Sequence, residues 1–267
     1  MPLKAAYLLP HSPLLIPEIG KANHEFFTKT NEAFVEAAEK IKNTETEVLI
    51  IISPHASLDH SFFQINVAPE MEINLQDFGF IPPKTTFTGA AVLADRIHQE
   101  LKDSFPIHLS SENIIDYGSA IPAYLLKKQG VNPRIMVVSI ATDLDKETQL
   151  NFGEALGKIV NNSEKNITII ASGDLSHRLQ KKSPGGYSPK AAKFDNKIIE
   201  ILSNEETAIE EIIKIDNNLI EIAGECALAP ITGILGVLKT KKFETEILAY
   251  QTEFGVGYLS AEFKFKD

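Results

Sequence analysis

The chain has 267 residues, of which 43% are apolar and 23% charged, the composition of a soluble globular protein with a sizeable core. Its formal net charge is −10. Nucleic acid and anionic membranes are bound by basic faces, so neither is expected as a partner. The single cysteine, Cys226, cannot form an internal disulfide, and no apolar run has the length of a membrane span. We therefore expect a cytoplasmic protein.

Short apolar runs bounded by turn residues predict the strands of a sheet. The clearest is Val48–Ile52, whose mostly β-branched residues are typical of a strand buried on both faces. Ser53-Pro54 ends this run, because proline has no N–H to give in a central strand. In chain order, the predicted strands are Ala5–Leu9, Val48–Ile52, Phe62–Val67, Ile107–Leu109, Arg134–Ile140, Ile167–Ala171, Ile247–Gln251 and Val256–Phe265.

Helical periodicity appears between these runs. Residues 68–87 contain three prolines and several acidic groups without a strong period, which predicts a long loop. The alternation of strands and helices predicts one α/β domain over residues 1–267, with a mostly parallel central sheet and helices on both faces. The predicted helices are Ala22–Ile41, Ala90–Leu101, Ile121–Lys128, Lys146–Val160, Ala191–Leu202, Glu205–Ile213 and Ala229–Leu238.

Three of the seven histidines follow a predicted strand and a turn residue. They are His11, His55 and His177. Open α/β sheets bind their ligands at the carboxyl ends of the strands, so we expect these three imidazoles to converge on one crevice. His60 lies five residues beyond His55 and is expected in the same crevice. The other histidines are expected on the surface or partly packed.

Two imidazoles and one carboxylate form the facial site of non-haem Fe(II) oxygenases. His11 and His55 could supply the imidazoles, and Glu225, just before an apolar helix, the carboxylate. Alternatively, Glu225 only stabilises the helix N-terminus through the dipole. Cys226 could itself be a ligand or pack as a small apolar residue. His177 could act as acid or base near neutral pH, while Asp174 could hold it or serve as a turn residue.

Three segments of the chain resemble, in order, the motifs of the catalytic subunits of class III extradiol ring-cleavage dioxygenases. These segments are Pro10–Leu14, Ile51–His55 and Ser172–His177. That family includes the catalytic subunit of protocatechuate 4,5-dioxygenase and the carboxyethylcatechol dioxygenases. The resemblance implies the family's α/β fold and an Fe(II) site.

By this resemblance, iron is held by His11, His55 and Glu225, and His177 is the acid–base catalyst. O2 would be the co-substrate, and the substrate a small aromatic diol that binds iron through both hydroxyls. His60 and Asp174 are expected to contact this substrate. Subunits of the family often associate, so a homo-oligomer is expected by analogy.

The stretch Asp116-Tyr117-Gly118 departs from the carboxyethylcatechol pattern, which has a histidine where this chain has Tyr117. A phenol, with a pKa near ~10, is not a base at neutral pH but can donate a hydrogen bond. We therefore expect Tyr117 at the catalytic site as a donor. The substitution also leaves open a substrate other than a simple catechol.

A second resemblance involves the cysteine. Cys226 through Ile231 is similar to the Cys-x-x-x-Pro-Ile pattern of Memo-like proteins, which share the fold. That resemblance implies Cys226 as the third metal-site residue and a metal- or redox-linked binding role without ring cleavage. Of the two, we expect Glu225, because a hard carboxylate suits Fe(II) beside two imidazoles.

Overall fold

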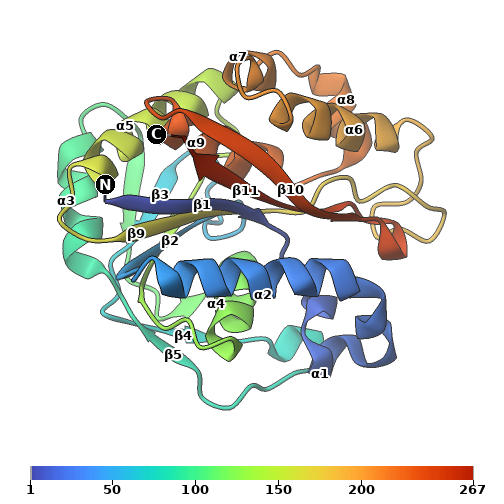
Figure 1. Cartoon of the computed structure of the whole chain (residues 1–267), viewed down its shortest axis with the longest axis horizontal. Coiled ribbons are helices and arrows are strands. Elements are labelled where there is room, and N and C mark those ends of the chain that lie inside the picture. The colour runs from blue at the N-terminus through green and yellow to red at the C-terminus, as the bar shows by residue number, and fades with distance from the viewer. Residues whose placement is uncertain (1, 267) are drawn as a thin grey trace.

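An eight-stranded sheet runs through the middle of the computed structural model, which describes residues 2–266 (Figure 1). Its strand order is β10-β11-β1-β9-β2-β8-β3-β6. The four strands β1, β9, β2 and β8 are parallel neighbours, whereas β3, β10 and β11 introduce antiparallel pairs. The bounds are β1 Leu3–Leu9, β2 Val48–Ser53, β3 Phe63–Asn66, β6 Ile107–Ser110, β8 Arg134–Ser139, β9 Ile167–Ser172, β10 Phe243–Gln251 and β11 Tyr258–Phe265.

Helices cover both faces of this sheet, as predicted. Alternate residues of β2 explain why: Leu49 and Ile51 join the core beneath α2 and α4, while Ile50 and Ile52 join the core beneath α3, α5 and α9. Figure 1 shows α2 and α4 on one side and α5 and α9 on the other. The bounds are α1 Pro17–Gly20, α2 Thr28–Asn43, α3 Ala91–Leu101, α4 Tyr117–Lys128, α5 Lys146–Asn161, α6 Ala191–Leu202, α7 Ala208–Ile212, α8 Asn217–Ala223 and α9 Leu228–Leu238.

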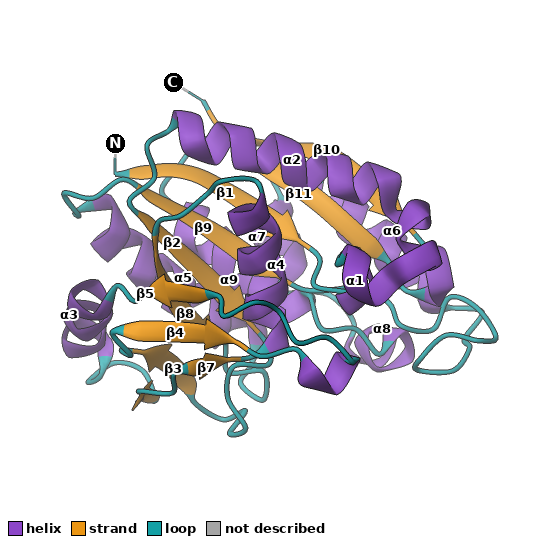
Figure 2. Ribbon diagram, turned by 90° about the horizontal axis from the view of Figure 1, so that it is seen from below, coloured by secondary structure: helices purple, strands orange, loops and turns teal. Residues whose placement is uncertain are grey.

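The expected long loop over residues 68–87 is wrong in part, because it holds two strands. β4 (Glu70–Ile73) and β5 (Thr86–Thr88) pair with each other, and β4 also pairs with β7 (Ile114–Ile115) to form a small second sheet (Figure 2). Met71 and Phe87 are buried in the core that also contains residues of α2 and α4. Strands this short are stabilised by that core rather than by their own pattern.

None of the helices in the described part of the chain is long and apolar enough to cross a membrane. The apolar helix α9 instead packs against α5 inside the protein. A Cβ added at Gly153 of α5 would lie 2.1 Å from the carbonyl oxygen of Gly233 in α9. The two backbones therefore meet closely enough that no side chain fits between them.

We expect Gly153→Ala to destabilise the protein by about 1–3 kcal/mol, because the added methyl group overpacks this crossing. In an exposed helix the same change would raise stability, since alanine is the better helix former. Urea denaturation measures the difference, and Asn151→Ala on the exposed face of α5 is the control. A stabilised Gly153→Ala variant would show that the helices do not pack this closely.

Candidate metal centre

The parallel strands β1, β9 and β2 end at the same level and bring three turns together. Leu9 of β1 pairs with Ser172 of β9, and Ile52 of β2 pairs with Ala171. The segments that follow carry His11, His55 and the turn leading to His177. Pairing of β9 on both sides therefore places its turn between the first two histidines.

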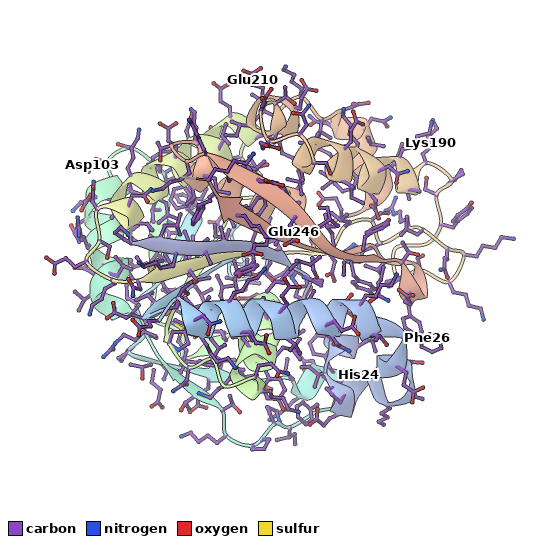
Figure 3. All side chains as sticks on the ribbon, in the orientation of Figure 1. His24, Phe26, Asp103, Lys190, Glu210 and Glu246 are labelled. Atoms are coloured by element: carbon purple, nitrogen blue, oxygen red, sulfur yellow. The ribbon has the colours of Figure 1, made fainter. Side chains whose placement is uncertain are left out.

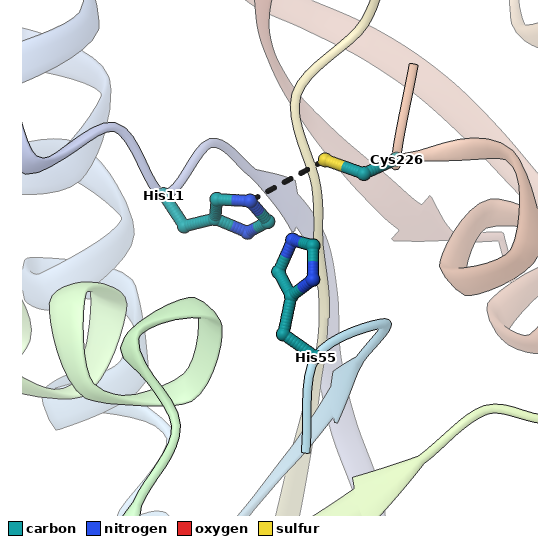
Figure 4. A group of neighbouring side chains, drawn as sticks. All are labelled: His11, His55 and Cys226. Atoms are coloured by element: carbon teal, nitrogen blue, oxygen red, sulfur yellow. Dashed lines mark hydrogen bonds between the residues drawn. The ribbon is translucent and has the colours of Figure 1, made fainter. Parts of the chain in front are cut away.

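The side chains of His11, His55 and Cys226 form a compact group at this edge of the sheet (Figure 4). One ligand atom from each lies within 4.8 Å of the others. The ring centroids of the two histidines are 5.1 Å apart. His11 Nε2 lies 3.4 Å from Cys226 Sγ. Residues more than 200 positions apart in the sequence thus meet at one point.

Hydrogen bonds fix the tautomer of His11. The hydroxyl of Ser172 donates to the carbonyl of Gly118, so its oxygen accepts from His11 Nδ1–H at 3.0 Å. Nε2 then carries the free lone pair and faces Cys226. The backbone N–H of His11 also donates to Asp174 Oδ1. This buried ring, 2% exposed, is held in the orientation that a metal ligand needs.

His55 carries a buried ring nitrogen without a partner. Its Nε2 has no hydrogen bond among the described residues. In Figure 4 a ring nitrogen of His55 points toward His11 and Cys226. The backbone of His55 is held by Ser53, whose hydroxyl accepts the N–H of His55 and donates to Asp116 Oδ1 at 2.7 Å. An unpartnered buried nitrogen beside two other metal-binding side chains is a position that a cation would satisfy.

Cys226 is placed by a turn and by the segment after β9. Gly224 has φ +60°, a left-handed conformation that ends α8 and turns the chain toward α9. Cys226 N–H then donates to the carbonyl of Asp174 at 3.1 Å, and Asp174 N–H donates to Cys226 Sγ at 3.3 Å. This reciprocal pair fixes the sulfur beside His11. This N–H favours the thiolate, but burial outweighs it and raises the pKa of the Cys226 thiol, so a bound metal ion would have to displace the thiol proton.

The expectation that Glu225 supplies the third donor does not match this arrangement. Its carboxylate accepts the N–H of Leu228 at 2.7 Å and so caps the N-terminus of α9. Glu225 is also absent from the group of ligand atoms around His11 and His55. The reason lies in the helix: its unpaired N–H groups and dipole attract the carboxylate. Cys226, one residue further, stands with the two imidazoles instead.

His177 and Tyr117 lie close to this group. His177 Nδ1–H donates to the carbonyl of Gly224 at 2.7 Å, which leaves Nε2 as an acceptor of protons. The ring of Tyr117 stacks on His55 with centroids 4.7 Å apart and meets His11 edge-on at 5.4 Å. Tyr117 thus packs against both imidazoles. A catalytic role for either residue stays a prediction.

His60 and Asp174, the two residues predicted to contact the substrate, lie on opposite sides of this group. His60 is exposed and, with His55 and Cys226, lines a cavity of about 940 Å³ outside the metal group. Asp174 is 4% exposed and lies behind the group, where it holds His11 and Cys226. Sequence reasoning did not assign a role to Ser53 or Ser172. Both are the last residue of a mostly apolar strand, and that pattern was a usable signal.

Burial controls the protonation of the centre. It lowers the pKa of His11, and the neighbouring His55 and His177 lower it further. Burial also lowers the pKa values of His55 and His177, so all three imidazoles are neutral near pH 7. The pKa of Cys226 is raised by burial, then by Asp174, and the pKa of Tyr117 is raised by burial. Neutral imidazoles are the form that binds metal ions.

The donor set fits a transition-metal ion. Imidazole and thiolate ligands of tetrahedral zinc lie at about 2.0–2.1 and 2.3 Å, which separates them by about 3.5 Å. The observed 3.4 Å between His11 Nε2 and Cys226 Sγ agrees with that spacing. Three protein ligands also leave a position open, as in catalytic rather than structural sites.

Comparison with known protein families gives one match over nearly the whole chain. The family model described as the catalytic LigB subunit of aromatic ring-opening dioxygenase matches residues 5–260. The chain belongs to this LigB family. Its members are associated with ring-opening dioxygenases, which agrees with the resemblance seen in the sequence motifs. The family assignment gives neither the substrate nor the metal of this LigB protein.

Two relatives extend this comparison. Protein CA_C1420 of Clostridium acetobutylicum is 30% identical over 97% of the chain, and the chain spans 57% of the length of that relative. The crystal structure of the uncharacterized protein JW3007 from Escherichia coli K12 superposes with a TM-score of 0.67. The superposition includes 97% of this chain and 99% of the JW3007 chain, and the aligned residues are 16% identical. The second likeness confirms the fold of this LigB protein.

Asp195 of α6 supports the turn that carries His177. The carboxylate is fully buried, accepts Ser176 N–H at 2.9 Å and accepts the hydroxyl of Tyr250 at 2.8 Å. Burial raises its pKa from 3.8 to about 6, and the two hydrogen bonds oppose the shift only in part. The folded protein therefore holds a proton on Asp195 that the unfolded chain releases between these two values.

The free energy of unfolding should accordingly fall by up to about 3 kcal/mol between pH 4 and 6, since only the folded state is protonated there. Below about pH 4 the carboxyl of Asp195 is protonated in both the folded and the unfolded state. Above about pH 6 it is ionised in both, and the full decrease in the free energy of unfolding has occurred. Asp195→Asn keeps an acceptor for Ser176 N–H but cannot ionise. Denaturation at pH 4.5 and 7.5 should show a larger decrease for the wild type than for the variant. An equal decrease would contradict this assignment.

Proposed function

We propose that this LigB-family protein binds one transition-metal ion through His11, His55 and Cys226 and acts on, or holds, a small molecule that enters from the adjoining cavity. The observation that carries the proposal is the meeting of Cys226 Sγ with the two imidazoles. A metal bound there would supply a Lewis-acid or redox centre. The protein would then resemble the Memo-like proteins more than the ring-cleaving enzymes.

The residues around the site support such a centre. Ser172 and Ser53 orient the two histidines, and Asp174 orients the cysteine. These are the outer hydrogen bonds that metal ligands usually receive. His177 Nε2 is free to take or give a proton to a molecule in the site. Tyr117, protonated at neutral pH, can donate a hydrogen bond.

Ring cleavage of a catechol with Fe(II) and O2 is the second candidate. The family match and the position of His177 favour it. The donor set argues for the first candidate. Non-haem Fe(II) oxygenases bind iron through two histidines and one carboxylate, whereas a thiolate ligand favours zinc, copper or iron–sulfur clusters. Oxygen uptake with a series of catechols, measured on metal-loaded protein, separates the two.

Cys226→Ser should lower metal affinity about 100-fold or more, because the loss of a direct ligand exceeds the 10–100-fold effect of an outer hydrogen bond. Glu225→Gln should leave affinity within about threefold, since its amide oxygen can still accept Leu228 N–H. Metal content and anaerobic titration with Zn2+ and Fe2+ measure both, and thermal melting of the metal-free variants shows that they fold. Loss of metal in Glu225→Gln with retention in Cys226→Ser would overturn the proposal.

Ser172→Ala should lower metal affinity by about 10–100-fold, because His11 loses the acceptor that fixes its tautomer. The ligand atoms themselves remain, so the stoichiometry at saturation should stay at one ion per chain. Ser203→Ala, at the end of α6, is a matched control outside the site. Equal affinity of the Ser172→Ala and Ser203→Ala variants would show that Ser172 does not orient a ligand.

A further inference from the structure

Two exposed phenylalanines form an aromatic patch beside the turn between β10 and β11. Phe26 and Phe254 are 57% and 36% exposed, and their rings meet edge-on with centroids 5.9 Å apart. Phe254 also stacks on the buried Phe27. The backbone of Phe254 has φ +57°, a left-handed conformation that is unfavourable for a bulky side chain. Strain of this kind is concentrated at functional and binding sites, so the aromatic patch is a candidate contact surface.

A basic segment, residues 178–193, lies against this patch. The carbonyl of Gly255, next to Phe254, accepts the N–H of Leu179 at 3.1 Å and the hydroxyl of Ser183 at 2.9 Å. The segment has no acidic residue, and none of its basic side chains forms an ion pair or a hydrogen bond with a described residue. It therefore presents unpaired positive charge, although the net charge of the chain is −10. These basic residues are Arg178, Lys181, Lys182, Lys190 and Lys193.

A groove on the outer face of α2 carries the opposite charge. Its volume is about 480 Å³, and His24 and the 40% exposed Val35 form part of its wall. Four glutamates complete it, of which only Glu36 forms an ion pair or side-chain hydrogen bond within the described part of the chain. The groove begins at the aromatic patch, because Glu25 directly precedes Phe26. In Figure 3, Lys190 of the basic segment and His24 of the groove lie on two sides of Phe26. The four glutamates are Glu25, Glu32, Glu36 and Glu39.

We infer that two copies of the chain associate through this surface. A two-fold axis brings identical surfaces together, so each copy must carry both halves of every charged contact. With the axis at the aromatic patch, the basic segment of each copy lies against the acidic groove of the other. Aromatic and arginine side chains are also the residues that contribute most at interface centres. This inference goes beyond the proposed function, and none of the three metal-site residues belongs to the surface.

Sedimentation velocity of the full chain over a range of concentrations tests the association. The wild type should form a dimer. Phe26→Ser/Phe254→Asn should weaken it at least about tenfold, because two aromatic anchors per copy are lost. Asparagine tolerates the left-handed backbone at position 254, and thermal melting shows that the variant folds. The control Val92→Ser/Leu109→Ser removes two other exposed apolar side chains and should leave the dimer unchanged. A monomeric wild type, or equal effects of both variants, would overturn the inference.

Charge reversal tests the arrangement of the two copies. Lys181→Glu/Lys182→Glu makes the basic segment acidic, and Glu25→Lys/Glu32→Lys makes the groove basic. Each variant alone should dimerise at least about tenfold more weakly, because both charged contacts of its dimer become repulsive. An equimolar mixture of the two should recover the affinity of the wild type. In the mixed dimer, the two acidic surfaces of one copy face the two basic surfaces of the other.

A matched charge reversal at the far end of the molecule is the control. Lys42→Glu/Lys102→Glu changes net charge as much as the basic-segment variant and breaks no ion pair. Figure 3 shows Asp103, the neighbour of Lys102, at the end of the molecule opposite Phe26. This control should dimerise like the wild type and gain nothing from mixing with Glu25→Lys/Glu32→Lys. Failure of the two reversed variants to recover on mixing, or an equal recovery with the control, would overturn the inference.

Discussion

The candidate site depends on the pairing of β9 with parallel neighbours on both sides. β1 and β2 form hydrogen bonds with β9 in registers that end all three strands together. The turn after β9 must then pass between His11 and His55. The same turn forms a reciprocal backbone and thiol contact with Cys226, which fixes where α9 begins. One register thus determines the position of every donor in the group.

The register of β9 with β1 and β2 explains how residues from both ends of the chain can be held together in one site. Each of the three residues is held by a hydrogen bond: Ser172 orients His11, Ser53 holds the backbone of His55, and Asp174 holds Cys226. The strand ends bring these three units within reach of one another. Ser53 and Ser172 are the last residues of β2 and β9, and Asp174 lies two residues beyond β9, so strands or a short turn directly after a strand hold all three supporting contacts.

The sequence was most informative where burial on both faces left a continuous apolar run. The strands predicted over Val48–Ile52, Arg134–Ile140 and Ile167–Ala171 correspond to β2, β8 and β9 within a residue at their ends. The edge placement of His55 followed from the first of these strands, and that of His11 from the strand predicted over Ala5–Leu9. In contrast, β4 and β5 are too short to show a period, and their pairing depends on a core contributed by α2 and α4.

The choice between Glu225 and Cys226 could not be made from the sequence. The two residues are adjacent, and either suits a metal site by chemistry alone. At the start of α9, Leu228 N–H donates to the carboxylate of Glu225, and the thiol of Cys226 lies beside His11 after the turn at Gly224. These contacts are why we propose Cys226 as the third ligand. Which of the two adjacent side chains meets the imidazoles depends on the backbone conformation of this single turn. The family match itself, over residues 5–260, does not contain that detail.

The most direct test of this account is X-ray absorption spectroscopy of the protein reconstituted with one equivalent of Zn2+. The account predicts two imidazole nitrogens at about 2.0–2.1 Å and one sulfur at about 2.3 Å from the metal. The sulfur contribution should vanish in Cys226→Ser. A first shell of nitrogen and oxygen alone in the wild type would contradict the assignment of Cys226 as a ligand.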